Sequence, residues 1–150
     1  MANINPYLSF NGNTEEVFNF YKSIFGGEFA TVMRYGDAPG CDEVEGGNKL
    51  SESDSSKIMH VALPIGSKGD VLMGSDVPDS MGQLKQGDNF SISISVDSKE
   101  EADRIFNGLA EGGKVEMPIA DAFWGAYFGM CADKFGVQWM VNYDPKYTQQ

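Results

Sequence analysis

The same succession of patterns occurs twice in this chain: a strand-like run, a helix-like run and a pair of glycines. In the first copy, apolar residues recur at positions i, i+3, i+4, i+7 and i+8 over 17–25, and Gly26-Gly27 follows. In the second copy, the same spacing covers 102–110, before Gly112-Gly113. Because an internal repeat constrains the architecture before any single element is assigned, we expect two similar modules.

Each helix-like run begins with a candidate capping box, a pair of residues that satisfies free backbone N–H groups at a helix start. The pairs are Asn13 with Glu16 and Ser98 with Glu101. We therefore expect helices over 13–25 and 98–111, and no third long helix.

Short apolar runs bounded by glycine, proline and polar residues predict the strands. The expected strands cover 5–11, 28–35, 58–65, 71–74, 90–96, 115–119, 126–132 and 137–143. The predicted fold is α+β, with two tandem β-α-β-β-β modules forming a curled mixed sheet around a cleft. Residues 36–56 lack apolar periodicity and predict a long loop without an assigned role. Its part over 51–56, with the acidic stretch before it, is expected to be mobile near the cleft.

The chain has 150 residues, 41% of them hydrophobic, and a net charge of −11. This size predicts one domain over 1–150, with modules at about 1–77 and 88–145. The acidic balance disfavours nucleic acid and anionic membranes as partners, and no apolar run is long enough to span a bilayer. Cys41 and Cys131 lie far apart and outside any metal-binding spacing, which predicts free thiols in a reducing compartment. With no signal-peptide pattern at the N-terminus, cytoplasm is the expected location.

Side-chain alternation separates two faces in the run 90–96, since successive strand residues point to opposite sides of a sheet. Ser91, Ser93 and Ser95 share one face, and the residues between and around them are apolar. The apolar face is expected to pack against the helices. Two more runs carry small or polar residues on the face away from the helices: Asn5, Tyr7 and Ser9, and Gln138, Met140 and Asn142. This pattern predicts a cavity lining, and the alternative is the solvated back of a sheet.

Six segments follow one another along the chain: Asn-Pro-Tyr-Leu-Ser-Phe-Asn-Gly at 5–12, Phe-Tyr-Lys-Ser-Ile-Phe-Gly at 20–26, Ile-Met-His-Val at 58–61, Leu-Met-Gly-Ser-Asp at 72–76, Phe-Trp-Gly at 123–125 and Asp-Lys-Phe-Gly-Val-Gln-Trp at 133–139. With the paired modules, they resemble the vicinal oxygen chelate superfamily of glyoxalases, extradiol dioxygenases and bleomycin-resistance proteins. The closer match is its PhnB-like branch. The resemblance implies a glyoxalase-like fold, but no single activity, because this scaffold hosts unrelated chemistries.

The resemblance also implies where a metal ion would bind. Metal-dependent members place histidines early on the first and fifth strands, an acid on the fourth and a glutamate on the eighth. The matching positions here are Asn5, Met73 or Gly74, Ser91 and Met140. A divalent ion needs several nitrogen or oxygen ligands that converge, and the one histidine, His60, lies on the third predicted strand. We therefore expect no metal and no cofactor, and neither glyoxalase nor ring-cleavage activity.

Other chemistries lack their motifs. The ubiquinone-related methyltransferase function attached to such domains needs a glycine-rich turn after a strand of a parallel sheet, and the chain lacks that alternation. There is no phosphate-binding loop and no nucleophile elbow. A nucleophile pair of Cys131 and His60 is conceivable, but a buried inert thiol is the preferred interpretation.

His60 is the side chain best suited to chemistry. It alternates with Ile58 and Ala62, which directs it into the cavity as a hydrogen-bonding group or a general base near neutral pH. The alternative is a structural histidine bonded to a neighbouring strand or to Asp76.

Two further side chains have alternative interpretations. Trp124, just before the seventh predicted strand, can stack on a planar ligand at the cavity mouth or simply pack. Arg34 can bind a carboxylate or phosphonate, or pair with the acidic loop.

The preferred function is a metal-free small-molecule-binding protein whose ligand is not specified by the sequence. The predicted ligand-binding residues are Tyr7, Arg34, His60, Ser91, Ser93, Trp124 and Met140. One alternative is a metal-independent enzyme that uses His60 or Asp76 for proton transfer. Others are a metal-dependent glyoxalase-type lyase or dioxygenase, if the matching of ligand positions is wrong, and a structural domain with a vestigial cleft.

Exposed strand edges and surplus aromatic residues predict a homodimer, with an unidentified small molecule as the other partner.

Overall fold

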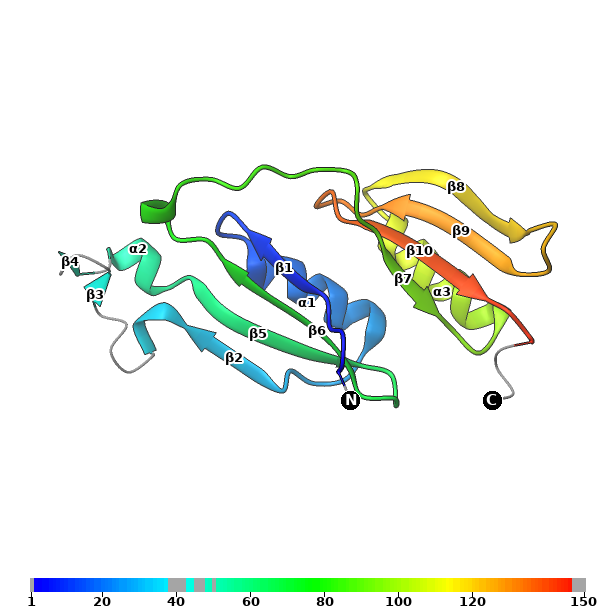
Figure 1. Ribbon diagram of the computed structural model, residues 1–150, viewed down its shortest axis with the longest axis horizontal. Coiled ribbons are helices and arrows are strands. Elements are labelled where there is room, and N and C mark those ends of the chain that lie inside the picture. The colour runs from blue at the N-terminus through cyan, green and yellow to red at the C-terminus, as the bar shows by residue number, and fades with distance from the viewer. Residues whose placement is uncertain (1, 38–42, 45–47, 50, 147–150) are drawn as a thin grey trace. The chain divides into compact units, whose positions relative to one another are not determined.

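The computed structural model of the chain describes residues 2–37, 43–44, 48–49 and 51–146 (Figure 1). The chain divides into two compact units, Met1–Lys85 and Gln86–Gln150. Each unit contains one four-stranded sheet and one long helix, and the order of its long elements is β-α-β-β-β. The predicted α+β class and the repeated order are confirmed. That the two modules together form one domain stays a prediction.

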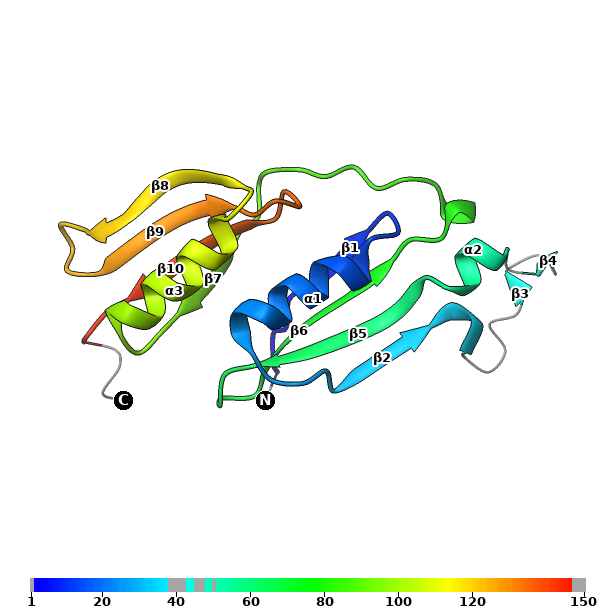
Figure 2. The same cartoon turned by 180° about the vertical axis from the view of Figure 1, so that it is seen from behind.

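The first unit is built from β1 (Tyr7–Phe10), α1 (Thr14–Phe25), β2 (Thr31–Arg34), β5 (Ile58–Ile65) and β6 (Asp70–Asp76). The strand order across the sheet is β1-β6-β5-β2. β1 runs parallel to β6, whereas the other neighbours are antiparallel. Figure 2 shows α1 in front of its sheet. One face is therefore covered by α1, and no helix of the described residues covers the other, which is called the helix-free face below.

The second unit repeats this arrangement with β7 (Ile92–Ser95), α3 (Lys99–Ala110), β8 (Lys114–Asp121), β9 (Tyr127–Ala132) and β10 (Gln138–Tyr143). Its strand order is β7-β10-β9-β8, and the first strand is again parallel to the last. α3 packs on β9 and β10.

Five short elements complete the described structure. They are η1 (Tyr35–Asp37), β3 (Glu43–Val44), β4 (Asn48–Lys49), α2 (Glu52–Ser55) and η2 (Asp79–Met81). β3 and β4 pair with each other. No helix within the described residues is both long and apolar enough to cross a membrane.

The core of the first unit lies between α1 and its sheet. The helical stripe of Val17, Phe18, Tyr21 and Ile24 is buried, as are Val61, Leu63 and Leu72 of the strands. Gly74 on β6 lets the helix approach, because a Cβ at this position would lie 2.7 Å from the Phe18 ring and 2.8 Å from the Leu8 carbonyl oxygen. Burial of a side chain the size of Phe18 contributes about 1.5–3 kcal/mol.

The start of α1 corrects the predicted capping box. The Asn13 side chain makes no capping hydrogen bond. Instead the buried Asp76 carboxylate, at the end of β6, accepts hydrogen bonds from Gly12 N (3.1 Å), Thr14 N (3.0 Å) and Thr14 Oγ1 (2.6 Å) on one oxygen. Its other oxygen accepts one from Ile58 N at 2.9 Å. A partner distant in sequence thus satisfies the free donors that the local pattern assigned to Asn13.

The start of α3 follows the prediction more closely. Ser98 Oγ accepts a hydrogen bond from Glu101 N at 3.1 Å. Glu101 Oε2 accepts a hydrogen bond from Asp97 N at 3.3 Å, whereas a capping box would use the N–H of the next residue, Ser98. The sequence signal at this helix therefore identified the cap.

A buried carboxylate also explains the segment 133–139. Asp133 Oδ1 accepts hydrogen bonds from Phe135 N (2.9 Å) and Val137 N (3.1 Å), and its Oδ2 accepts one from Trp139 Nε1 at 2.9 Å. Asp133 and Trp139 are both buried. This part of the family-like motif therefore shapes the turn between β9 and β10 and fixes the largest core side chain.

The segment 51–56 was predicted as a loop but contains the helix α2, and its mobility stays a prediction. Ser51 caps α2 by accepting a hydrogen bond from Asp54 N at 3.1 Å. The buried Asp54 carboxylate then binds Lys57 Nζ at 2.8 Å, and Lys57 also binds Asp79 at 2.9 Å. This cluster ties α2 to η2. The rest of the predicted loop lies partly outside the described residues, which leave out 38–42, 45–47 and 50.

Candidate functional site

The helix-free face of the first sheet is defined by its cross-strand pairs. One row runs Tyr7, Met73, Ala62 and Thr31 across β1, β6, β5 and β2. In the next row, Ser9 pairs with Ser75, and His60 pairs with Met33. Except for the imidazole of His60, these side chains are hydroxyl-bearing or apolar. Tyr7, Ser9 and His60 therefore share the helix-free face, as their alternation predicted, and their lining of a cavity stays a prediction.

Tyr7, on the edge strand β1, and His60, on the inner strand β5, form a stacked pair on this face. Their rings stack with centroids 5.8 Å apart and planes inclined by 26°. The Tyr7 hydroxyl lies 3.5 Å from His60 Nδ1, at the outer limit of a hydrogen bond. Tyr7 is 49% exposed, so the pair is open to solvent. A phenol beside an imidazole offers a planar surface together with a donor and an acceptor.

A bulge in β5 explains why His60 lies on the helix-free face whereas Ile58, two residues earlier, lies on the helix-covered face. Met33 pairs with His60 but Arg34 pairs with Ile58, so β5 carries one extra residue between the two pairs. The bulge turns Ile58 toward α1, where it is buried, while His60 and Ala62 stay on the helix-free face. The predicted alternation of all three residues is therefore corrected at Ile58.

Arg34 lies apart from this pair, on the helix-covered face. Its guanidinium forms an ion pair with Glu15 of α1 and donates a hydrogen bond to the Ser56 carbonyl oxygen at 2.8 Å. The structure therefore does not bring Arg34 together with Tyr7 and His60. Asp76 is also turned to the helix side, where four hydrogen bonds occupy its carboxylate.

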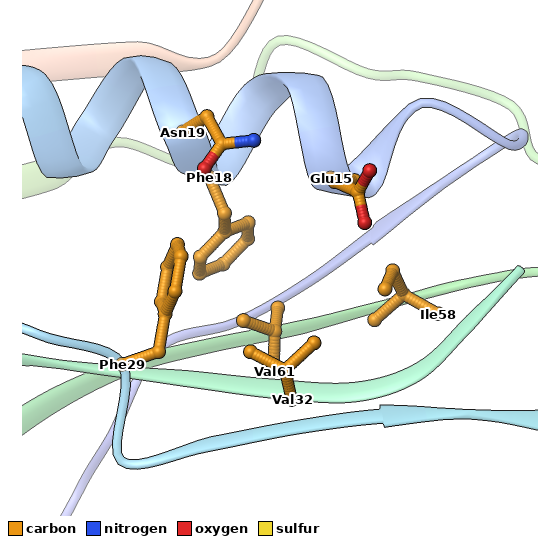
Figure 3. Close-up of a pocket in the computed structure, with 7 residues that line it drawn as sticks. All are labelled: Glu15, Phe18, Asn19, Phe29, Val32, Ile58 and Val61. Atoms are coloured by element: carbon orange, nitrogen blue, oxygen red, sulfur yellow. The ribbon is translucent and has the colours of Figure 1, made fainter. Parts of the chain in front are cut away.

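A small pocket lies on the same helix-covered face (Figure 3). It has a volume of about 180 Å³ and is lined by Glu15, Phe18, Asn19, Phe29, Val32, Ile58 and Val61. Figure 3 shows the apolar side chains gathered between α1 and the sheet, with Glu15 and Asn19 on the helix. Ligand pockets usually measure about 300–1,000 Å³, so this one suits a single ring or a side chain at most.

The helix-free face of the second sheet has two rows of paired residues. The first row runs Ser93, Met140, Met130 and Met117 across β7, β10, β9 and β8. The second runs Ser95, Asn142, Phe128 and Ala120. Gly129 identifies the opposite face, because a Cβ there would lie 2.9 Å from the Phe106 ring of α3. The predicted residues Ser93 and Met140 thus share one row, and Ser91 precedes β7 in the same alternation.

Trp124 lies in the turn between β8 and β9. Its ring packs edge-on against Phe128, with centroids 5.8 Å apart, and against Phe123 at 5.0 Å. Trp124 is 51% exposed, whereas Trp139 is buried. The contact with Phe128 joins Trp124 to the helix-free face of this sheet.

Several residues of these faces were not among the predicted ligand-binding residues. They are Met33, Met73, Ser75, Met117, Phe128 and Met130. Alternation within 70–76 already separates Met73 and Ser75 from the buried Leu72 and Gly74, and could have found them. Met117 could not be placed in this way, because β8 contains two register shifts.

Cys131 is buried within the second unit and is a free thiol. Burial, reinforced by the charges of Asp133 and Glu116, raises the pKa of Cys131 to about 11. A thiol with so little thiolate is a poor nucleophile at neutral pH. The preferred interpretation of Cys131 as an inert core residue is supported.

Comparison with known proteins identifies the family. The family model for the glyoxalase/bleomycin resistance protein/dioxygenase superfamily matches residues 3–141. The chain belongs to this superfamily. It is similar to protein YjdN of Escherichia coli strain K12, with 30% identity over 141 residues that cover 93% of each chain.

Solved structures extend the comparison. Protein PA1353 of Pseudomonas aeruginosa is 40% identical, with a TM-score of 0.80 over 96% of this chain and 98% of that one. A PhnB protein from Bacillus cereus, described as a putative 3-demethylubiquinone-9 3-methyltransferase, is 27% identical, with a TM-score of 0.67 over 95% and 99% of the two chains. The glyoxalase-like fold and the resemblance to the PhnB-like branch are confirmed.

Some superfamily members bind a metal ion, so the donor set of this member is informative. Among the described residues, no group of three or more His, Cys, Asp or Glu side chains is placed to hold a metal. At the matching positions, Asn5 Oδ1 already accepts a hydrogen bond from Val71 N at 3.2 Å, and Gly74 has no side chain. Ser91 and Met140 offer a hydroxyl and a thioether, which are weak ligands for the divalent ions of such sites. The side chains at these matched positions do not supply the ligands of that metal centre.

Proposed function

We propose that this superfamily member binds a small organic molecule on its helix-free sheet faces, without a metal ion. The stacked Tyr7–His60 pair carries the proposal. An aromatic pair that is half open, flanked by hydroxyls and held on the rigid strands of a sheet presents a flat surface with directed hydrogen-bonding groups.

The metal-free part of the proposal rests on the donor set. The fosfomycin resistance protein FosX of Listeria monocytogenes, 12% identical with a TM-score of 0.58, shares the fold and was crystallised with Mn(II) and sulfate. Asn5, Met73 or Gly74, Ser91 and Met140 supply no carboxylate and no imidazole at the corresponding positions of this chain. His60 is the only imidazole in the chain, and its ring stacks on that of Tyr7.

Native mass spectrometry with elemental analysis of the purified protein tests both parts. We expect a small organic mass on the native protein and less than about one tenth of a metal ion per chain, since the donor set does not suit divalent ions. Replacing both Tyr7 and His60 by alanine should remove the organic mass that the first sheet binds, whereas Ser23→Ala, on the exposed side of α1, should retain it. Stoichiometric zinc, nickel, iron or manganese after desalting would contradict the metal-free proposal.

Proton transfer by His60 is the second candidate. The observation that favours it is the Tyr7 hydroxyl beside Nδ1, which can orient the ring and leave Nε2 for a substrate proton. Turnover that is lost in His60→Ala but survives a chelator would select this candidate over simple binding. Asp76 does not support the same role, because its oxygens receive four hydrogen bonds on the other side of the sheet.

A methyltransferase role finds no support in the described architecture. The long strands form two small mixed sheets, and neither sheet alternates parallel strands with helices on both sides. The glycine-rich turn of a nucleoside-binding site requires that alternation.

The proposal further assigns the protein to the cytoplasm as a homodimer. The buried free thiol of Cys131 suits a reducing compartment. Phe90 and Phe123 are 82% and 99% exposed, and such apolar side chains are common at interfaces. Sedimentation at micromolar concentration should give the mass of two chains, and a single species of one-chain mass would refute the dimer.

A further inference from the structure

The helix-free face of the second sheet changes character from one edge to the other. At the β7 edge, Ser93 and Ser95 carry hydroxyl groups and are exposed. Toward β9 and β8, Met130 and Met117 lie side by side with Phe128 in the next row. Trp124 packs against Phe128 at the end of these strands. The face is therefore apolar toward the β8 edge of the sheet and carries hydrogen-bonding groups toward the β7 edge.

Few charged side chains occupy the paired positions of this face, although the chain carries a net charge of −11. Among the paired positions of the two rows and their extension to Ala132, the only charged side chain is Lys114, at one end of β8. Glu116 lies at a register shift of β8, outside the paired positions. Two aspartates bind partners on the helix-covered face instead. Asp121 forms an ion pair with Lys99, and Asp103 accepts a hydrogen bond from the Tyr127 hydroxyl.

The three methionines of the first row give this face a particular chemistry. Met140 pairs with Met130, and Met130 pairs with Met117, so three thioethers lie in line across adjacent strands. Facing residues on neighbouring strands have Cβ atoms about 4.5–5.5 Å apart, which allows all three to contact one flat molecule. Methionine is flexible and polarisable, and its sulfur makes favourable contacts with aromatic rings.

From these observations we infer the ligand class of the second sheet: an uncharged, planar aromatic molecule with a hydrogen-bonding substituent. Its ring lies on Met117, Met130 and Phe128, and its substituent points toward Ser93 and Asn142. A charged substituent at Ser93 and Asn142 is disfavoured because its charge would lose water. Lys114, the one charged side chain at the paired positions of this face, lies on β8 at the opposite edge of the sheet and cannot pair with it. This inference rests on the proposed binding function and specifies what one face binds.

Two dyes with the same ring system test the inference. N-phenyl-1-naphthylamine is neutral, and 8-anilinonaphthalene-1-sulfonate adds an anionic sulfonate to the same anilinonaphthalene. Fluorescence titration of the full chain should show the neutral dye binding at least about tenfold more tightly than the sulfonate, which corresponds to about 1.4 kcal/mol.

Matched variants locate the binding. Met117 and Met81 are both exposed methionines, 46% and 76%, and Met81 lies on η2 of the first unit. Met117→Glu should weaken binding of the neutral dye by about fivefold, because the carboxylate must be desolvated under the ring. Met81→Glu and Met117→Leu should change it by less than about twofold, since neither alters the charge of the face. Circular dichroism checks that each variant folds, and Ser93→Ala supplies a second probe of the face on an exposed side chain.

Each result has a defined consequence. If the sulfonate binds as tightly as the neutral dye and Met117→Glu weakens both, the face binds ligands but the inferred class is wrong, and the proposed function survives. If the neutral dye binds but neither Met117→Glu nor Ser93→Ala affects it more than Met81→Glu does, the inferred site is wrong. If neither dye binds, both the inference and the role of this face in the proposed function fail.

Discussion

Replacing Asp76 by asparagine tests how the first unit is held together. The Asp76 carboxylate is 2% exposed and accepts four hydrogen bonds, from Gly12 N, from Thr14 N and Oγ1, and from Ile58 N. An asparagine amide keeps the shape but loses the charge. Whichever way it is oriented, its NH₂ group faces at least one of these donors.

The expected loss follows from the hydrogen bonds that change. Leaving one buried backbone donor unpaired costs about 1–3 kcal/mol, and hydrogen bonds to a charged group are each worth about 1.5–3 kcal/mol. Because some donors keep a weaker partner, we expect Asp76→Asn to lower the free energy of unfolding by about 2–4 kcal/mol. Asp76→Ala, which removes every acceptor, should lower it by more.

Urea denaturation followed by circular dichroism measures this loss, with Asp70→Asn as the matched control. Asp70 begins the same strand, is exposed and undergoes the same change of charge. It should alter the free energy of unfolding by less than about 0.5 kcal/mol. If Asp76→Asn is as stable as Asp70→Asn, the carboxylate does not anchor the start of α1, and the reasoning is refuted.

Three further predictions follow from buried groups. In a Cys41→Ser background, Cys131 should react with Ellman's reagent at pH 7.5 at least about a hundredfold more slowly in the native protein than in urea, because the buried thiol is hardly ionised; equal rates would contradict its burial. The Lys57 ammonium lowers the pKa of Asp54 below its ordinary value of 3.8, so the Asp54 carboxylate stabilises the fold above pH 3.8 and loses this effect as the pH falls through its lowered pKa. The stability gap between wild type and Asp54→Asn, measured by thermal unfolding, should therefore be full at neutral pH and close in acid, and a gap that widens in acid would refute the ion pair. Gly74→Ala should cost about 1–3 kcal/mol in the same assay, because its Cβ would overlap the helix that packs on β6, and a neutral change would show that the helix is further away.

The repeat and the faces of the strands could be predicted because both are local properties of the sequence. Helical spacing identified α1 and α3, and alternation identified the face of Ser93 and Met140, since each sheet is covered by a helix on one side only. The cap of α3 was also readable, because Ser98 and Glu101 are neighbours on one turn.

Other features depend on partners distant in sequence, which local patterns do not contain. Asp76 has the capping role that was predicted for Asn13, because the end of β6 lies beside the start of α1. Arg34 forms an ion pair with Glu15 on α1. A bulge in β5 places Ile58 and His60 on opposite faces of the sheet. The segment 51–56 was predicted as a mobile loop because nothing in its composition indicates that Asp54 is buried against Lys57.

Methionine methyl resonances provide the most direct test of binding on the helix-free faces. The chain has eight methionines, and five of those within the described residues pair on these faces: Met33, Met73, Met117, Met130 and Met140. Met81 lies on η2 and is an internal control. A ¹³C-methyl-methionine sample can be titrated with the small molecules released from the protein by denaturation. The account predicts shifts confined to methyl groups of these faces, lost for Met33 and Met73 when Tyr7 and His60 are both replaced by alanine, with Met81 unchanged. Shifts at Met81 with none at the five face methionines would contradict it.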